Sequence, residues 1–149
     1  MIVRTIGAEG QGMVPFVLNG LWNQSNAGGC SNNPTFGLNP AWAVHITQET
    51  EVLMRLSIVA QSKAGHGETI DPDQFKACIG MSLFRINQNT FPVAPNTIQV
   101  SSLKHPTLET HDGHYTWNLS AAVSKKTKVA EGVYILVPAT FEPHCYAQF

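Results

Sequence analysis

Hydrophobic and polar residues alternate in short runs along this chain, and a period of two is typical of β-strands. The clearest runs are 42–47, 52–58, 115–120 and 133–137. In the last run the intervening residues are apolar too, which predicts a strand buried on both faces. The run 79–86 changes phase partway: Ile79, Met81 and Leu83 give way to Phe84 and Ile86, which predicts a β-bulge.

Turn-forming residues separate these runs at 47–50, 64–67, 71–73, 92–95 and 111–114. No segment sustains an apolar period of 3.6 residues between helix caps. Seven or eight short strands at this spacing are typical of two packed antiparallel sheets. The pattern therefore predicts an all-β protein, an antiparallel β-sandwich of about eight strands.

Composition agrees with a single loop-rich domain. The chain has 149 residues, 43% of them hydrophobic and only 13% charged, about half the usual charged share. The formal net charge is −1, so broad nucleic-acid binding by counterion release is not expected. No apolar run approaches the roughly 18 residues of a membrane-spanning helix.

The three cysteines, Cys30, Cys78 and Cys145, are too few and too odd in number for a disulfide framework. Residues 1–7 lack the apolar core and the cleavage pattern of a signal peptide. Both observations predict a cytoplasmic location.

A long loop is expected between residues 20 and 40, where turn formers lie between Trp22 and Phe36. Gly28 and Gly29 can adopt backbone angles closed to other residues, and Asn39-Pro40 favours an extended exit. We expect this loop to cross one end of the sandwich, held by Trp22 and Phe36, and to present a rigid surface.

The same loop resembles the opening of the C2-like β-sandwich, or domain III, that follows the protease core in calpains. The shared pattern is W-x-x-x-x-A-G-G-C-x-N-x-x-x-F-x-x-N-P, and the positions that carry it are Trp22, Ala27, Gly28, Gly29, Cys30, Asn32, Phe36, Asn39 and Pro40. A second likeness covers 132–143, a strand followed by a Pro-containing turn. The resemblance extends over residues 16–149, so residues 1–15 are expected to be a lead-in segment or the end of a preceding module.

No catalytic residue is expected in this chain. Cys30 matches the family's structural AGGC segment rather than its catalytic cysteine motif. Cys145 follows His144, and adjacent residues of a strand point to opposite faces, which disfavours a catalytic pair. His111 and His114 flank an Asp-Gly turn, but a structural zinc site needs four ligands, so a solvated hairpin is favoured.

Calcium is weighed separately, because the resemblance implies an acidic loop in conventional calpains. Residues 47–51 hold only two carboxylates at that place, and calcium takes 6–8 oxygen ligands. The other candidates are Glu68, Asp71 and Asp73. We expect no cofactor and no strong calcium binding, a departure that points to atypical calpains such as the PalB type.

The only basic cluster is Lys125, Lys126 and Lys128. It is either a charged strand edge that discourages sheet association or a contact for anionic lipid or a partner.

Three functions remain open. The first is a non-catalytic regulatory and interaction domain of a calpain-family intracellular cysteine protease, docking to the protease core, to a neighbouring domain of the same chain or to partner proteins. For the PalB branch the resemblance implies ESCRT-related partners. The second is a calcium-assisted or lysine-assisted phospholipid-binding module that targets an anionic membrane. The third is an independent hydrolase using Cys30 or Cys145, which we do not expect.

Overall fold

A computed structural model of the chain describes residues 2–6, 13–59, 61–62, 69–70, 77–86, 107–111, 121–123 and 126–149. These residues form short strands and one 3₁₀ turn, with no α-helix among them. The elements are β1 (Ile2–Ile6), β2 (Met13–Val17), β3 (Leu21–Trp22), η1 (Phe36–Leu38), β4 (Trp42–Ile46), β5 (Thr50–Ser57), β6 (Gln61–Ser62), β7 (Thr69–Ile70), β8 (Ile79–Ile86), β9 (Thr107–His111), β10 (Ala121–Val123), β11 (Thr127–Val129), β12 (Gly132–Thr140) and β13 (Ala147–Gln148).

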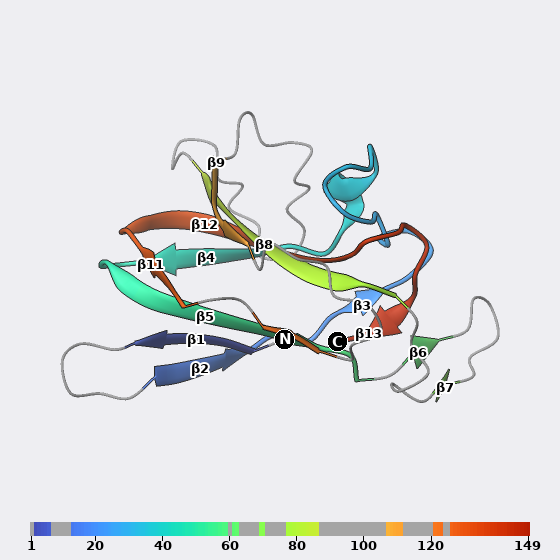
Figure 1. Ribbon diagram of the computed structural model, residues 1–149, viewed down its shortest axis with the longest axis horizontal. Helices are drawn as coiled ribbons and strands as arrows, with labels where there is room; N and C mark the ends of the chain where they lie inside the picture. Colours follow the sequence, from blue (N-terminus) through green and yellow to red (C-terminus); the bar gives the residue numbers. More distant parts are fainter. Residues whose placement is uncertain are drawn as a thin grey trace.

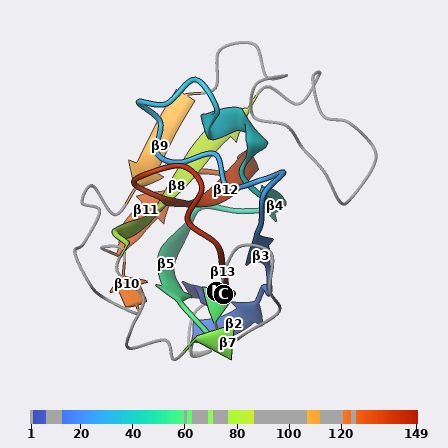
Figure 2. The same cartoon turned by 90° about the vertical axis from the view of Figure 1, so that its right-hand side faces the viewer.

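Two antiparallel sheets form the body of the molecule (Figure 1). One has the order β10-β5-β1-β2, with β11 also pairing with β5, and the other has the order β4-β12-β8-β9. Figures 1 and 2 show the two sheets stacked face to face, with the short β3–β13 pair at one end. The predicted antiparallel β-sandwich is therefore confirmed.

The predicted lead-in contributes strands of its own. β1 pairs with β2 and also with β5, so both segments extend the five-stranded sheet. β2 stands at the edge of that sheet in the described part of the chain. Its Pro15 suits an edge strand, because proline has no backbone N–H to donate to a further strand.

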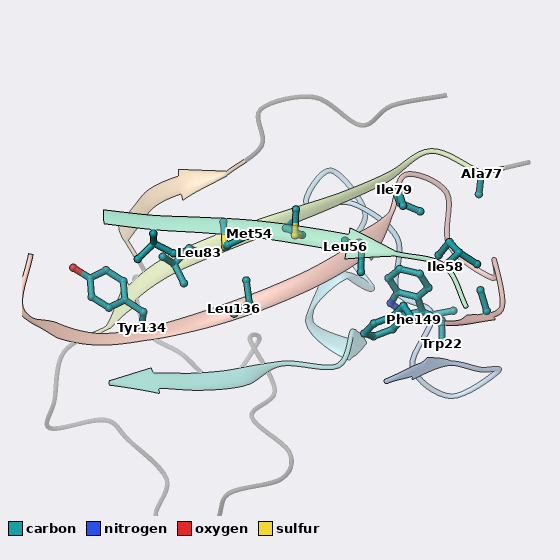
Figure 3. Close-up of a cluster of buried hydrophobic side chains, with 14 of the residues drawn as sticks. Trp22, Met54, Leu56, Ile58, Ala77, Ile79, Leu83, Tyr134, Leu136 and Phe149 are labelled. Carbon is teal, nitrogen blue, oxygen red and sulfur yellow. The ribbon is translucent and has the colours of Figure 1, made fainter. Parts of the chain in front are cut away.

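The main hydrophobic core lies between the two sheets (Figure 3). Along β5, Val52, Met54 and Leu56 are buried while Arg55 is exposed, as the alternation predicts. Leu83, Tyr134 and Leu136 meet them from the opposite sheet, and Trp22 and Phe149 close one end of the cluster (Figure 3). Burial of each large apolar side chain stabilises the fold by roughly 1.5–3 kcal/mol.

Strand β12 is buried on both faces, which confirms the prediction from its continuous apolar run. Tyr134 and Leu136 belong to the main core, whereas Ile135, Val137 and Ala139 belong to a second cluster with Phe36. The loop that carries Phe36 thus supplies a third layer on the outer side of the four-stranded sheet.

The predicted bulge in 79–86 is also found. The pairing of β8 with β9 shifts register between Leu83 and Phe84. The change in the alternation of apolar residues therefore coincides with the β-bulge. Leu83 enters the main core, and Phe84 packs on the second cluster. The run 115–120 and the turn after His111 lie outside the described residues.

Candidate docking surface

The loop of residues 20–40 begins at Trp22, whose side chain is fully buried in the main core. Its ring centroid lies 4.3 Å from that of Phe149, and Phe149 in turn contacts Trp42 at 5.9 Å. Gly20 and Phe149 exchange backbone hydrogen bonds of 2.8 and 3.0 Å. A Cβ at position 20 would lie 2.4 Å from the Phe149 ring, so only glycine permits this close approach.

Phe36 anchors the far half of the loop. It lies in η1 and packs in the second cluster, with its ring centroid 6.0 Å from that of Phe84 in an edge-on arrangement. The predicted placement of Trp22 and Phe36 as buried anchors is observed. Trp22 lies in the main core, whereas Phe36 lies in the second cluster.

Between the anchors, the side-chain amide of Asn39 holds the loop together. Asn39 is 3% exposed, and its Oδ1 accepts a hydrogen bond of 3.2 Å from the Gly28 amide. Its Nδ2 donates to the carbonyl oxygens of Gly29 at 2.7 Å and Phe36 at 2.9 Å. This buried amide fixes the loop because it satisfies the Gly28 amide and the Gly29 carbonyl oxygen, and it adds a second donor to the Phe36 carbonyl oxygen, which also accepts from the Asn39 backbone amide at 3.1 Å.

The Gly-Gly pair has a different requirement at each position. A Cβ on Gly28 would lie 2.1 Å from the carbonyl oxygen of Thr35, whose hydroxyl donates to the Gly28 carbonyl oxygen at 2.7 Å. Gly29 has a φ of +77°, a left-handed conformation that favours glycine. Steric approach therefore explains the first glycine. Backbone conformation explains the second, together with the Pro143 nitrogen, which would lie 2.8 Å from a Cβ there.

A second segment, residues 141–144, is joined to the loop by backbone hydrogen bonds. The Cys30 amide donates to the Phe141 carbonyl oxygen at 3.0 Å, and the His144 amide donates to the Ala27 carbonyl oxygen at 3.0 Å. Asn33 Nδ2 also donates to the Phe141 carbonyl oxygen, at 3.2 Å. The loop and this turn therefore form one rigid unit at the end of the sandwich (Figure 1).

We call the outward side of this unit the loop surface. Its two large apolar members are Leu38, 46% exposed, and Phe141, 41% exposed. Its exposed polar and small members are Ser31, Asn32, Pro34, Glu142 and His144.

Most residues of the loop motif are buried, and one is exposed on the loop surface. Ala27, Cys30, Phe36 and Asn39 are buried with the two glycines, Pro40 is half-buried, and Asn32 is exposed. Sequence reasoning did not single out Asn33, Thr35 or Phe149, although each makes a contact that holds the loop. An Asn-Asn-Pro-Thr run signals side-chain hydrogen bonds in a turn, but it does not show which carbonyl oxygens accept them.

Two thiols near this unit, those of Cys78 and Cys145, are poor nucleophiles. Burial, and secondly the Glu142 carboxylate, raise the pKa of both Cys145 and Cys78 above the ordinary value of 9.0. Cys145 Sγ faces the Pro143 carbonyl oxygen at 4.0 Å and the Thr140 hydroxyl. Raised pKa values disfavour the thiolate that nucleophilic chemistry requires.

The candidate lysines and carboxylates lie together at the opposite end of β5. Lys126 Nζ lies 3.9 Å from Glu51, and Lys128 pairs with Glu49, with all four side chains about half exposed or more. The Glu49 hydrogen bond is the main cause of the raised pKa of Lys128. These charges face one another, while Lys125, Glu68, Asp71 and Asp73 lie outside the described residues.

No group of three or more His, Cys, Asp or Glu side chains in the described ranges could hold a metal ion. His111 ends β9, and His114 falls outside those ranges. Among the residues whose structure is described, no helix has both the length and the apolar character needed to cross a bilayer.

Comparison with known proteins gives a family match over nearly the whole chain. The model described as "Calpain large subunit, domain III" matches residues 18–149. The calpain-like protease palB/RIM13 of Cryptococcus neoformans is 28% identical over 137 residues, which cover 92% of this chain and 14% of that protein. Mouse calpain-5 is 28% identical over 145 residues, covering 89% of this chain and 20% of the relative.

A relative of another kind is serine/threonine-protein kinase 4 homolog B of Dictyostelium discoideum. It is 26% identical over 141 residues, which cover 91% of this chain and 11% of the kinase. The chain therefore spans a fifth or less of the length of these relatives.

Proposed function

The chain belongs to the family of calpain large subunit domain III, and from this premise we propose that it is a non-catalytic docking domain of a calpain-like cysteine protease. The observation that carries the proposal is the rigid loop surface. Its backbone is fixed by Asn39 and by the bonds to residues 141–144. A surface ordered before binding loses less conformational entropy when a partner docks, so contact is the role that this geometry suits.

The partner of the loop surface is the protease core or a neighbouring domain of the same parent chain. Leu38 and Phe141 supply the apolar contacts, and Asn32, Glu142 and His144 supply polar groups around them. Protein interfaces commonly combine exposed apolar and polar groups of this kind. For a parent of the palB type, ESCRT-related proteins are the further candidates.

The kinase relative supports contact as the role of the domain. A domain shared by a protease and a kinase cannot owe its presence to peptide hydrolysis alone. The raised pKa values of Cys78 and Cys145 agree with a part of the chain that holds no nucleophile. Their reduced state, together with buried Cys30, suits a cytoplasmic parent.

Lysine-assisted lipid binding is the weaker candidate. Lys126 and Lys128 face Glu51 and Glu49, so an anionic membrane would have to displace internal partners. The same two carboxylates would have to leave their lysines to bind calcium. No observed contact favours either event.

The docking proposal is tested in the full-length parent protein. A benzoylphenylalanine cross-linker replaces Leu38, and a matched control places it at His45, an exposed residue of β4. We expect cross-links from position 38 to peptides of the protease core or the adjoining domain, and their loss with Phe141→Glu. Equal yields from positions 38 and 45, or none from position 38, would contradict the proposal.

A further inference from the structure

The outer face of the five-stranded sheet carries exposed apolar side chains. Along β5 and its extension, Val52, Met54, Leu56 and Ile58 point into the core. The alternate residues, among them Arg55 and Val59, therefore point outward. Both are exposed, and Val59 is 62% exposed.

Pairing brings two further aliphatic residues to this face. The Val59 amide donates to the Gln148 carbonyl oxygen at 2.8 Å, and Gln148 is the register partner of Leu21, which is 38% exposed. On the other side, Ile2 is the register partner of both Arg55 and Val17. Val17, 61% exposed, thus stands in the same row as Arg55, two strands away, a separation of roughly 10 Å.

Arg55 is the charged member of this group. Its Nε donates to Ser57 Oγ at 3.2 Å, which orients the guanidinium. In the described part of the chain it pairs with no carboxylate. Its two Nη groups are therefore free to bind a carboxylate in the two-bond geometry that arginine favours.

We propose that Val17, Leu21, Arg55 and Val59 form a second docking surface, whose partner is a carboxylate set among apolar side chains on another part of the same parent chain. The proposal deepens the docking function above and rests on it. Charge complementarity indicates the partner's chemistry: an arginine that shares a sheet face with exposed aliphatic side chains, and has no carboxylate partner among the described residues, matches an acid set among aliphatic groups.

The modest size of the surface favours a partner in the same chain. Stable complexes between separate proteins bury about 800 Å² on each partner, more than a few aliphatic side chains supply. Covalent linkage gives neighbouring domains a high effective concentration, so a small contact is sufficient. The relatives carry this domain within much longer chains.

A membrane is the less suitable partner, because attraction to anionic lipid grows with the number of cations near the surface. Arg55 is the only cation among the four residues of the surface.

The test uses the full-length parent with benzoylphenylalanine at Val59, beside the Leu38 and His45 variants described above. We expect a cross-link from position 59 to an Asp- or Glu-containing apolar peptide of the parent. Arg55→Glu should lower its yield about tenfold, as expected for loss of a charge-assisted contact. The yield from position 38 should stay unchanged, which separates the two surfaces. Hydrogen exchange of 132–140 verifies that the variant is folded.

Several results would overturn the second surface. One is no cross-link above that of position 45; another is a cross-link that Arg55→Glu leaves intact. Cross-links only between two copies of the parent, or sedimentation with phosphatidylserine vesicles that depends on Arg55, would assign the face to another partner. If position 59 fails while position 38 succeeds, the loop surface stands and this inference falls. If position 38 alone fails, the proposed role of the loop falls.

Discussion

Trp22 and Phe36 belong to one loop but are buried in different hydrophobic clusters, one on each face of β12. The loop therefore wraps around the end of the four-stranded sheet and is held from both sides. Neither anchor can leave its cluster without disturbing the hydrogen bonds between them. This arrangement explains how a loop rich in glycine and asparagine remains ordered.

Phe36→Ala should lower the free energy of unfolding by about 3–5 kcal/mol, because it empties the centre of the second cluster. Urea denaturation monitored by tryptophan fluorescence measures the change. Phe141→Ala is the matched control, since Phe141 is 41% exposed and should cost far less. A Phe36→Ala midpoint equal to that of the parent domain would show that the loop contributes no packing.

Asn39→Ala should lower the free energy of unfolding by about 2–4 kcal/mol, because it removes the side-chain partner of the Gly28 amide and of the Gly29 carbonyl oxygen in a buried site, while the Phe36 carbonyl oxygen keeps its bond from the Asn39 backbone amide. Asn32→Ala tests the same substitution at an exposed position of the same loop and should change stability by less than about 0.5 kcal/mol. Thermal unfolding of the two variants provides the comparison. Similar losses for both would refute the assigned role of Asn39.

His144→Gly should stabilise the domain by about 1 kcal/mol. His144 has a φ of 63°, and a left-handed conformation costs roughly that amount for a residue with a Cβ. The same change at His45, an exposed residue of β4, should instead destabilise by about 0.5–1 kcal/mol, because glycine weakens a strand. A pair of differential scanning calorimetry measurements decides the sign at each position.

Stability should fall as the pH rises above about 9. The pKa values of Cys145 and Cys78 are raised by burial, and secondly by Glu142, so the folded domain holds their protons where the unfolded chain releases them. Their stabilising contribution is complete below the unfolded pKa and is lost as the pH rises through the folded pKa. Urea midpoints at pH 8 and 10 measure the loss.

A Cys78→Ser, Cys145→Ser double variant is the control for this pH dependence and should show a smaller fall. Lys128 has a raised pKa as well, but its ordinary value is 10.5, so its contribution persists to higher pH. An identical fall in the double variant would assign the effect to other groups.

The sequence predicts strands well where the pattern is local. The alternation in β5, the two-faced burial of β12 and the bulge in β8 all follow from residues close together in the chain. The family likeness was likewise visible from the loop motif. Residues 2–6 and 13–17 were not predicted as strands, because their pairing with β5 is a long-range relationship.

The contacts that fix the loop surface were harder to predict. Nothing near Cys30 in the sequence indicates that its amide binds the carbonyl oxygen of Phe141, and nothing near Gly20 indicates Phe149. That no carboxylate in the described part of the chain pairs with Arg55 is equally a property of the assembled sheet. These contacts join residues that are far apart in the sequence, so they can be identified only once the fold is known. The residue types that make them possible are visible in the sequence.

The bonds between Gly20 and Phe149 bring together the two ends of the segment that they bracket. Because β1 and β2 precede Gly20 and belong to the five-stranded sheet, this closure lies within the sandwich and ties β13 back to the start of β3.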